Sequence, residues 1–262
     1  MATLPLRTLF GTLLALCCMH AGYSLSPEER EAARSVMERT VPALKAVPGK
    51  LKLEAVKQEN GCDVFETESS GGVLTVRGSS GTALCRGFYD FLKTNGLGMV
   101  AWDNKDIRWP ARIPDTPRRR VASPFRHHYY FNAVTYGYTM PYWTWERWER
   151  EIDWMALHGI DMPLALAATE GIAVRVWKRL GLTQKEIDEF YTGPAHLPWQ
   201  RMGNLVNHDG FLNDNWHRDQ IAMQHNILRR MKSLGMTPVC PAFSGFVPQG
   251  IRRLYPEAKL HR

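Results

Sequence analysis

Residues 144–166 read TWERWEREIDWMALHGIDMPLAL, a pattern in which a helix passes directly into a strand. Four apolar side chains recur at helical spacing and form one stripe, namely Trp145, Trp148, Ile152 and Met155. Gly159 ends this predicted helix, which spans 144–158, and the apolar run 160–166 has the length of a buried strand. The succession favours an α/β protein with a parallel sheet.

The same rhythm continues on both sides of this stretch. Further predicted elements are a strand at 129–134, helices at 170–180 and 215–234, a strand at 237–240 and the start of a helix near 248. Strands that alternate with long helices predict the first strands of a (β/α)8 barrel. Three strands leave the sheet open, so we expect residues 126–262 to form an incomplete TIM barrel.

The preceding region, residues 25–112, has a different pattern. Ser26 and Pro27 predict the start of a helix that runs to about residue 40. Short alternating segments separated by Asn-Gly and Gly-Gly turns predict a small antiparallel sheet, at 51–56, 62–67 and 73–77. With a helix at 80–92 and a last strand at 99–102, these elements predict a compact α+β domain.

Residues 113–125 are rich in proline and predict a linker between this domain and the barrel. They contain the basic triplet Arg118-Arg119-Arg120, which we expect to be solvated, with a polyanion contact as the weaker alternative. The other basic residues that give the chain its net charge of +7 are spread along its length. No nucleic-acid-binding motif is present in the sequence, so nucleic acid is not an expected partner.

Residues 1–24 have the layout of a secretory signal peptide: a basic residue, an apolar run and then small residues. We therefore expect the protein to be exported. Lipidation at Cys17 or Cys18 is a less favoured alternative, because Leu16 is bulky where a lipid-acceptor site requires a small residue. The apolar run is shorter than the roughly 20 residues of a bilayer-spanning helix, so no membrane span is expected.

Few residues suggest metal chemistry. Beyond residue 24 the cysteines are Cys62, Cys85 and Cys240, an odd number without metal-ligand spacing. We expect all three to be small buried packing residues. His127 and His128 are adjacent on a predicted strand, where neighbouring side chains point to opposite faces. We predict no metal and no cofactor, and the sequence shows no Ser-His-Asp or Cys-His arrangement.

Long, tryptophan-rich motifs give the chain a resemblance to a known family. The sequence resembles the α-N-acetylglucosaminidase family from about residue 25 to residue 262, in YYFN (129–132), RWEREIDWMAL (147–157), FYTGPA (190–195), WQRMGN (199–204) and GMTPV (235–239). In that family a small α/β domain precedes a (β/α)8 barrel and a helical C-terminal domain. The resemblance therefore agrees with the two regions predicted above.

The resemblance implies a retaining glycoside hydrolase that removes terminal α-linked N-acetylglucosamine from glycans of glycosaminoglycan or mucin type. Such an enzyme uses two carboxylates about 5–5.5 Å apart. In the family both are glutamates on later barrel strands, so the catalytic residues are expected beyond Arg262 and this chain alone is expected to be inactive. The implied location is periplasmic or extracellular in a bacterium and lysosomal in animal relatives.

Barrel active sites form at the C-terminal ends of the strands. Asn132 ends the first predicted strand and matches a family position near the sugar pocket, where its amide can donate and accept hydrogen bonds; the alternative is a turn asparagine. Glu170 follows the second strand and matches a carboxylate close to the substrate site; stabilisation of a helix N-terminus is an equal alternative.

The loop between the second strand and the third helix contains Trp199. It matches a family tryptophan that offers an apolar face to the sugar ring, with loop packing as the alternative. Gly203 and Asn204 are expected to shape this loop and to touch the ligand. In contrast, Glu151 and Asp153 on the helix at 144–158 are expected to face outwards, so neither is a candidate catalytic acid.

The chain departs from the family pattern at four positions near the expected pocket rim, which are Val134, Thr169, His208 and Phe246. Together they allow a shifted specificity or a loss of activity. The rival interpretation is a non-catalytic carbohydrate-binding protein derived from such an enzyme. The sequence leaves the natural glycan and the oligomeric state open.

Overall fold

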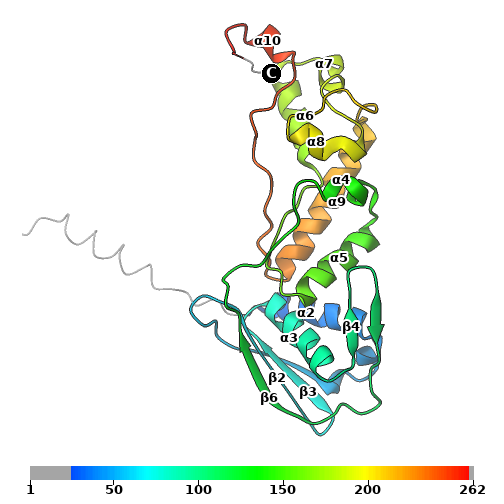
Figure 1. Ribbon diagram of the computed structural model, residues 1–262, viewed down its shortest axis with the longest axis vertical. Helices are drawn as coiled ribbons and strands as arrows, with labels where there is room; N and C mark the ends of the chain where they lie inside the picture. Colours follow the sequence, from blue (N-terminus) through cyan, green and yellow to red (C-terminus); the bar gives the residue numbers. More distant parts are fainter. Residues whose placement is uncertain (1–24, 260–262) are drawn as a thin grey trace, which may run out of the picture.

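The computed structural model describes residues 25–259. The signal-peptide prediction for residues 1–24 lies outside these residues. The described chain has two parts arranged along one long axis, a small sheet with two helices at one end and a mainly helical part at the other (Figure 1). Within residues 25–259 we find no helix with the length and apolar character needed to cross a membrane.

The first helix, α2 (Pro27–Thr40), begins as the sequence predicted. The backbone N–H of Glu29 donates to Ser26 Oγ at 3.1 Å, and the Ser26 N–H donates back to Glu29 Oε2 at 2.9 Å, which forms a capping box. Two short 3-10 turns follow, η1 (Pro42–Ala46) and η2 (Pro48–Lys50). Prolines at the start of both turns end the α-helix at this point.

The N-terminal sheet has four strands in the order β1-β3-β2-β6. Their bounds are β1 Leu51–Ala55, β2 Val64–Ser70, β3 Val73–Gly78 and β6 Thr116–Ala122. The β2–β3 and β2–β6 pairs are antiparallel, but β1 pairs parallel with β3. The prediction of an antiparallel sheet is therefore wrong for one pair, because β1 runs parallel to β3. β6 occupies the other edge of the sheet, beside β2.

The predicted solvated linker at 113–125 contains strand β6 instead. The basic triplet in it is paired with acidic side chains of the same sheet domain: Arg118 and Arg120 with Glu66, and Arg119 with Asp90. Glu66 is only 2% exposed, so its carboxylate requires these cations. The triplet is thus a structural part of the sheet, and the polyanion contact loses its basis.

Helix α3 (Gly81–Thr94) packs on the sheet and is capped by Ser80, whose Oγ accepts from the Ala83 N–H at 3.0 Å. The predicted last strand is one half of a hairpin formed by β4 (Gly98–Val100) and β5 (Lys105–Ile107). Figure 1 shows α2 and α3 between the sheet and the helical part, so both helices have a second packing face there.

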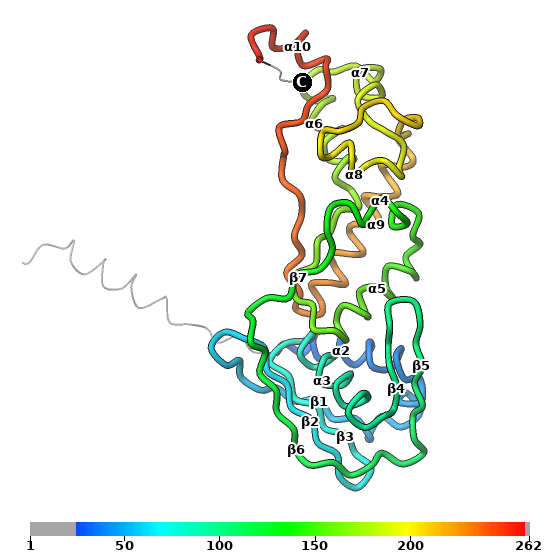
Figure 2. The backbone as a smooth tube through the Cα atoms, viewed as in Figure 1, coloured from blue at the N-terminus to red at the C-terminus, as the bar shows by residue number. Residues whose placement is uncertain are grey.

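The helical part contains three parallel strand positions, all of them shorter than predicted. Strands β7 (Tyr129–Tyr130) and β8 (Met162–Pro163) pair in parallel, and a single parallel bridge joins Leu164 to Val239. β7 stops early because Phe131 has a left-handed backbone with φ of +76°. The segment after α9 pairs with β8, because the Val239 N–H donates to the Pro163 carbonyl oxygen at 2.8 Å, and it then continues in an extended path up to α10 (Figure 2).

The long helices confirm the predicted alternation. They are α5 (Trp145–Leu157), α6 (Thr169–Leu180) and α9 (Asp214–Ser233). Shorter elements complete the part: α4 (Tyr136–Thr139), η3 (Met140–Tyr142), α7 (Gln184–Asp188), η4 (Pro194–His196), α8 (Leu197–Arg201) and α10 (Ile251–Leu254). Parallel strand positions with intervening helices are the start of a TIM barrel, as the sequence predicted.

One side chain links the two parts through a buried ion-pair cluster, which we call the junction cluster. Asp153 of α5 accepts from Arg39 of α2 at 2.6 and 2.8 Å and from Arg230 of α9 at 3.0 Å. The prediction that Asp153 faces outwards was wrong, because α5 is covered by the N-terminal helices. Close backbone contact accompanies the cluster: a Cβ on Gly81 would lie 2.6 Å from the carbonyl oxygen of Leu234.

Candidate functional site

The loops that follow the parallel strands gather at one end of the barrel part. Helix α4 follows β7, α6 follows β8, and α8 lies beside α4 in both views (Figures 1 and 2). A Cβ on Gly137 of α4 would lie 2.7 Å from the ring of Pro198 in α8, so the two helices are in direct contact. This end of the strands is where barrel active sites form.

Asn132 lies at the start of the loop after β7 and is exposed. Its Oδ1 accepts hydrogen bonds from the Val134 N–H at 2.9 Å, the Thr135 N–H at 3.0 Å and the Thr135 hydroxyl at 3.0 Å. The side-chain oxygen therefore holds the turn. Its Nδ2 group has no hydrogen bond to any residue in the described range, so both of its N–H donors remain available to a ligand or to solvent.

Glu170 lies in the first turn of α6 and is 3% exposed. Arg201 of α8 donates to both carboxylate oxygens, from Nε to Oε1 at 2.6 Å and from Nη2 to Oε2 at 2.9 Å. Arg201 Nη2 also donates to the carbonyl oxygen of Leu166 at 3.2 Å. The carboxylate thus faces the helix N-terminus and a fork of two donors, which is a strong and directional arrangement.

Two buried tyrosines border this ion pair. The guanidinium carbon of Arg201 lies 4.7 Å from the ring centre of Tyr136. Burial, followed by the nearby charge of Glu170, raises the pKa of both Tyr136 and Tyr191 above the ordinary value. Burial by itself lowers the pKa of Arg201, but Glu170 outweighs burial, so the net pKa is raised. Both tyrosines are therefore neutral at physiological pH, and Arg201 carries its positive charge.

Trp199 lies in α8, and Gly203 and Asn204 lie in the turn that ends this helix. The Gly203 N–H donates to the carbonyl oxygen of Gln200 at 3.0 Å, and the Asn204 N–H donates to that of Trp199 at 2.9 Å. Gly203 has a φ of +80°, a conformation that favours glycine. The Trp199 ring is half-buried, while Gly203 and Asn204 are exposed.

The Trp199 ring is part of a row of aromatic side chains. Tyr138 packs edge-on against it with ring centres 6.2 Å apart, and His196 lies 6.3 Å away. His196 in turn contacts His208, with ring centres 4.6 Å apart. Because Tyr138 is 70% exposed and Trp199 is half-buried, the row presents apolar ring surface to solvent at the strand ends.

The four departures from the family pattern are placed as follows. Val134 belongs to the turn held by Asn132. The Thr169 hydroxyl donates to the Leu166 carbonyl oxygen at 3.1 Å, and the His208 carbonyl oxygen accepts from the Gly193 N–H at 2.8 Å. The remaining position, Phe246, packs on Phe190 with ring centres 5.1 Å apart and lies next to Gly203. Thr169 is the first residue of α6, and the other three positions lie in loops or turns.

Glu151 was also expected to face outwards, and it is fully buried. It accepts hydrogen bonds from Trp102 Nε1 at 2.9 Å, from the Tyr130 hydroxyl at 3.0 Å and from Arg147 Nη1 at 2.7 Å. The sheet domain covers α5 here as well, but at Glu151 the covering residue is Trp102, which lies between β4 and β5. Both carboxylates are engaged in structural hydrogen bonds.

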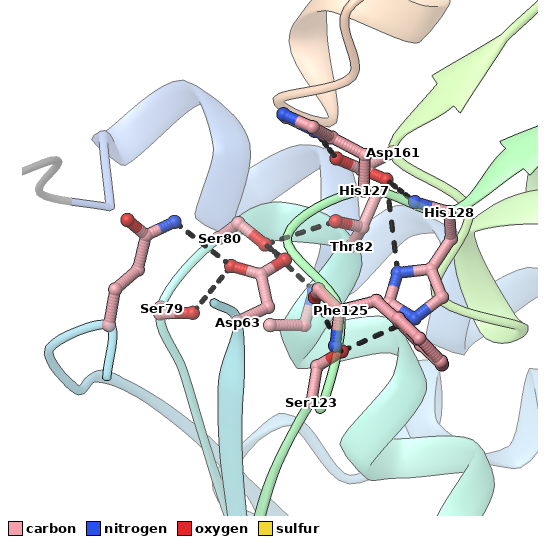
Figure 3. A network of polar contacts seen from close by, with 11 residues as sticks. Asp63, Ser79, Ser80, Thr82, Ser123, Phe125, His127, His128 and Asp161 are labelled. Atoms are coloured by element: carbon pink, nitrogen blue, oxygen red, sulfur yellow. Dashed lines mark hydrogen bonds and ion pairs between the residues drawn. The ribbon is translucent and has the colours of Figure 1, made fainter. Parts of the chain in front are cut away.

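A polar network joins the sheet domain to the barrel strands (Figure 3). His127 Nδ1 lies 2.8 Å from Asp161 Oδ2, and the His128 backbone N–H donates to the same carboxylate. His128 Nε2 lies 3.3 Å from Ser123 Oγ. His127 thus contacts Asp161 through its ring and His128 through its backbone, and both residues precede β7. Within the described residues no group of three or more His, Cys, Asp or Glu side chains is arranged to hold a metal ion.

The order Ser123, His128, Asp161 resembles a catalytic triad only in composition. His128 Nδ1 lies 3.9 Å from Asp161 Oδ1, which is too long for a hydrogen bond. The Ser123 hydroxyl lies 2.7 Å from the carbonyl oxygen of Phe125 and donates to it. A serine whose proton is already donated to the backbone has no base to activate it. The network therefore holds the connection between the two parts.

Two residues of the site, Arg201 and Tyr136, were not predicted individually. Arg201 lies inside the WQRMGN motif, and its signal was available: a buried glutamate after a barrel strand requires a cation, and arginine is the usual partner. Tyr136 carried no such signal, because its packing against the guanidinium depends on how two distant loops meet.

The fold and the strand-end loops define a class, an α/β protein in which a small sheet domain precedes the first part of a TIM barrel. The family profile for the "Alpha-N-acetylglucosaminidase (NAGLU) tim-barrel domain" matches residues 128–262, and the profile for the N-terminal domain matches residues 31–115. The chain belongs to the alpha-N-acetylglucosaminidase family.

Individual relatives agree with this assignment. Human alpha-N-acetylglucosaminidase is 42% identical over 245 residues, which cover 92% of this chain and 33% of the human protein. A solved structure from Clostridium perfringens, in complex with its substrate GlcNAc-α-1,4-galactose, matches with a TM-score of 0.83 at 29% identity. That match covers 88% of this chain and 26% of the bacterial one. The chain thus spans about a third of the human relative's length.

A second structure from Clostridium perfringens, a family 89 glycoside hydrolase in complex with PUGNAc, matches with the same TM-score of 0.83 and 29% identity. These relatives are glycoside hydrolases, and the resemblance noted in the sequence is confirmed at the level of family and fold. The partial barrel agrees with the share of the relatives that the chain covers.

Proposed function

We propose that this chain forms the N-terminal domain and the first barrel strands of a glycoside hydrolase that removes terminal α-linked N-acetylglucosamine from glycans. The position of Trp199 carries the proposal. Its half-buried ring lies at the C-terminal end of the parallel strands, where a flat indole can cover the C–H face of a pyranose. The identity to the human enzyme and the fold of the bacterial one support this activity class.

The chain's own residues supply binding and positioning in this proposal. The free Nδ2 group of Asn132 donates hydrogen bonds to sugar hydroxyl or acetamido oxygens. Trp199 forms an apolar wall, and Gly203 and Asn204 set the shape of the loop that carries it. The glycans are of glycosaminoglycan or mucin type, and the substrate of the Clostridium perfringens protein, a GlcNAc linked α-1,4 to galactose, supports α-linked N-acetylglucosamine as the terminal sugar.

The proposed chemistry is a retaining mechanism with two carboxylates about 5–5.5 Å apart, one acting as nucleophile and one as acid and then base. Glu170 is the carboxylate buried at the strand ends of the described residues, and both of its oxygens accept from Arg201. It is therefore unsuited to attack or to protonate a sugar. We propose that the catalytic glutamates come from later barrel strands and that the 262-residue chain alone is inactive.

Two further proposals concern organisation. Export rests on the residue pattern of 1–24. The division into a domain at 25–112 and a barrel part at 126–262 is supported by the two family profiles, although β6 adds residues 116–122 to the N-terminal sheet.

A non-catalytic carbohydrate-binding protein is the second candidate function. The row of rings formed by Tyr138, Trp199, His196 and His208 favours it, because these contacts are complete within the described residues. A sugar-binding surface made of aromatic rings requires no catalytic carboxylate.

Two measurements on the purified chain separate the candidates. Calorimetry with N-acetylglucosamine should detect weak binding that W199A abolishes, whereas glucose, which lacks the acetamido group, should bind more weakly. Incubation with an aryl α-N-acetylglucosaminide should release no chromophore. Hydrolysis at the rate of a full-length relative would refute the proposal that the catalytic residues lie elsewhere, and a lack of any sugar binding would remove both candidates for this chain alone.

A further inference from the structure

The guanidinium of Arg201 lies where four segments of the barrel part meet. It extends from α8, donates to Glu170 on α6, donates to the carbonyl oxygen of Leu166 after β8, and covers the ring of Tyr136 on α4. The Tyr136 hydroxyl in turn donates to Gln220 Oε1 of α9 at 3.3 Å. One side chain thus connects the loops that follow the first two barrel strands.

Helix α8 depends on this anchor. It has five residues, far fewer than a helix needs to be stable without tertiary contacts. Trp199 precedes Arg201 by two positions on α8, so the placement of its ring follows the placement of the guanidinium. Gly137 and Pro198 bring α4 within contact distance of the same helix. Movement of Arg201 would therefore displace the Trp199 ring relative to the loop of Asn132.

Burial keeps the Glu170 carboxylate from contacting a sugar. Its side chain is 3% exposed and that of Arg201 is 11% exposed, and both carboxylate oxygens accept short hydrogen bonds. A planar guanidinium bound through two parallel hydrogen bonds is fixed in orientation as well as position. Arg201 Nη1 is buried without a hydrogen-bond partner among residues 25–259, so the two bonds to Glu170 are the principal restraint on its plane.

We propose that Glu170 and Arg201 act as a positioning pair that fixes the Trp199 wall against the Asn132 loop, and that Glu170 acts through Arg201 instead of touching the sugar. The role assigned to Trp199 rests on the proposed function. The placement of the ring by the pair does not depend on it.

The test uses the whole chain and two readouts. The first is the indole N–H resonance of Trp199 in a proton–nitrogen NMR spectrum, identified by its loss in W199F. The second is the affinity for N-acetylglucosamine from calorimetry. R201K keeps the positive charge but loses the two parallel donors, and E170Q loses the negative charge but keeps the shape. The double variant E170Q/R201M removes both charges. It therefore leaves no unpaired buried charge and replaces R201M if that single variant fails to fold.

The chain offers a matched control. Arg253 donates to Glu186 through the same two nitrogens, Nε at 2.9 Å and Nη2 at 2.8 Å, but this pair is on the surface between α7 and α10. R253K should leave the Trp199 resonance and the sugar affinity unchanged. R201K and E170Q should shift the resonance and weaken sugar binding by about tenfold or more, the scale that misplacement of a binding group produces.

Each outcome decides the proposal. An unchanged Trp199 resonance in both R201K and E170Q/R201M would overturn it. Weaker binding in E170Q with an unmoved resonance, and wild-type behaviour in R201K, would show that Glu170 touches the sugar directly and would also overturn it. If the wild-type chain binds no sugar, the proposed function fails for this chain, whereas the resonance still reports whether the pair positions Trp199.

Discussion

Replacement of Asp153 by asparagine tests how the two parts of the molecule are joined. Its carboxylate accepts three hydrogen bonds, two from Arg39 and one from Arg230, and its side chain is 11% exposed. D153N removes the negative charge and leaves two guanidinium groups facing a neutral amide. Glu149, 3.7 Å from Arg39, is then the remaining acidic residue paired with these cations among the described residues.

The expected loss in the free energy of unfolding follows from the burial and the charge of this cluster. Removal of one partner from a buried ion pair costs about 3–5 kcal/mol, and the lower end applies here because the Arg39 side chain is 33% exposed. A loss of about 3 kcal/mol is a large share of a total stability of about 5–15 kcal/mol. For a chain of this size it corresponds to a fall in Tm of about 6–12 °C.

Urea denaturation followed by tryptophan fluorescence and by circular dichroism measures this loss and shows whether the two parts unfold together. The control is E189Q, which breaks an exposed pair with Lys185 on the surface and should change the stability by less than about 1 kcal/mol. A midpoint for D153N that equals that of E189Q would refute the argument that the junction cluster joins the two parts.

Three further predictions concern single residues. G81A should destabilise the chain by about 1–3 kcal/mol, because its methyl group would meet a backbone carbonyl at the end of α9, whereas G49A has open space and should not; thermal unfolding compares them. Burial raises the pKa of the Cys85 thiol, so a maleimide should label Cys240 in the native chain and Cys85 only after denaturation, as mass spectrometry would show. A hydrogen bond from Arg253 lowers the pKa of Glu186 to about 2. The stabilisation that the ionised Glu186 contributes is therefore complete above pH 4.5 and is lost as the pH falls through 2. The stability difference between wild type and E186Q should shrink over that range, and a difference independent of pH would contradict this.

The long helices were predictable because their signals are local. The apolar stripe of α5 and the glycines that follow α5, α6 and α9 depend on spacing and backbone conformation alone. The capping box of α2 is equally local. Each of these elements therefore has bounds close to the prediction.

The strands were less predictable, because their ends and partners depend on distant residues. The basic triplet in a proline-rich stretch indicated a linker, but Glu66 on β2 supplies the charge that makes β6 a strand. β7 ends early because the backbone turns left-handed at Phe131, where neither glycine nor asparagine signals the change. Pairing of β1 with β3 similarly follows from which edge of β2 is occupied.

The candidate site was predictable to the level of loops. The rule that barrel sites lie after the strands, together with the family resemblance, selected Asn132, Glu170 and Trp199, and the structure places all three in loops or helix starts that follow strand positions. The outward orientation of Glu151 and Asp153 was wrong, because helical periodicity shows which residues share a face but not how many faces are covered.

The close contact between the N-terminal helices and α5 and α9 has a consequence for synthesis. Residues 25–122 leave the ribosome before α5 and α9, and they contain the whole four-stranded sheet with its two helices. Domains generally fold as units during translation, N-terminal first. The outer faces of α2 and α3, with Arg39 on α2, are then already formed when α5 and α9 emerge and pack against them. The sheet domain thus covers apolar surface of the first barrel helices during synthesis, before the parallel barrel sheet is closed.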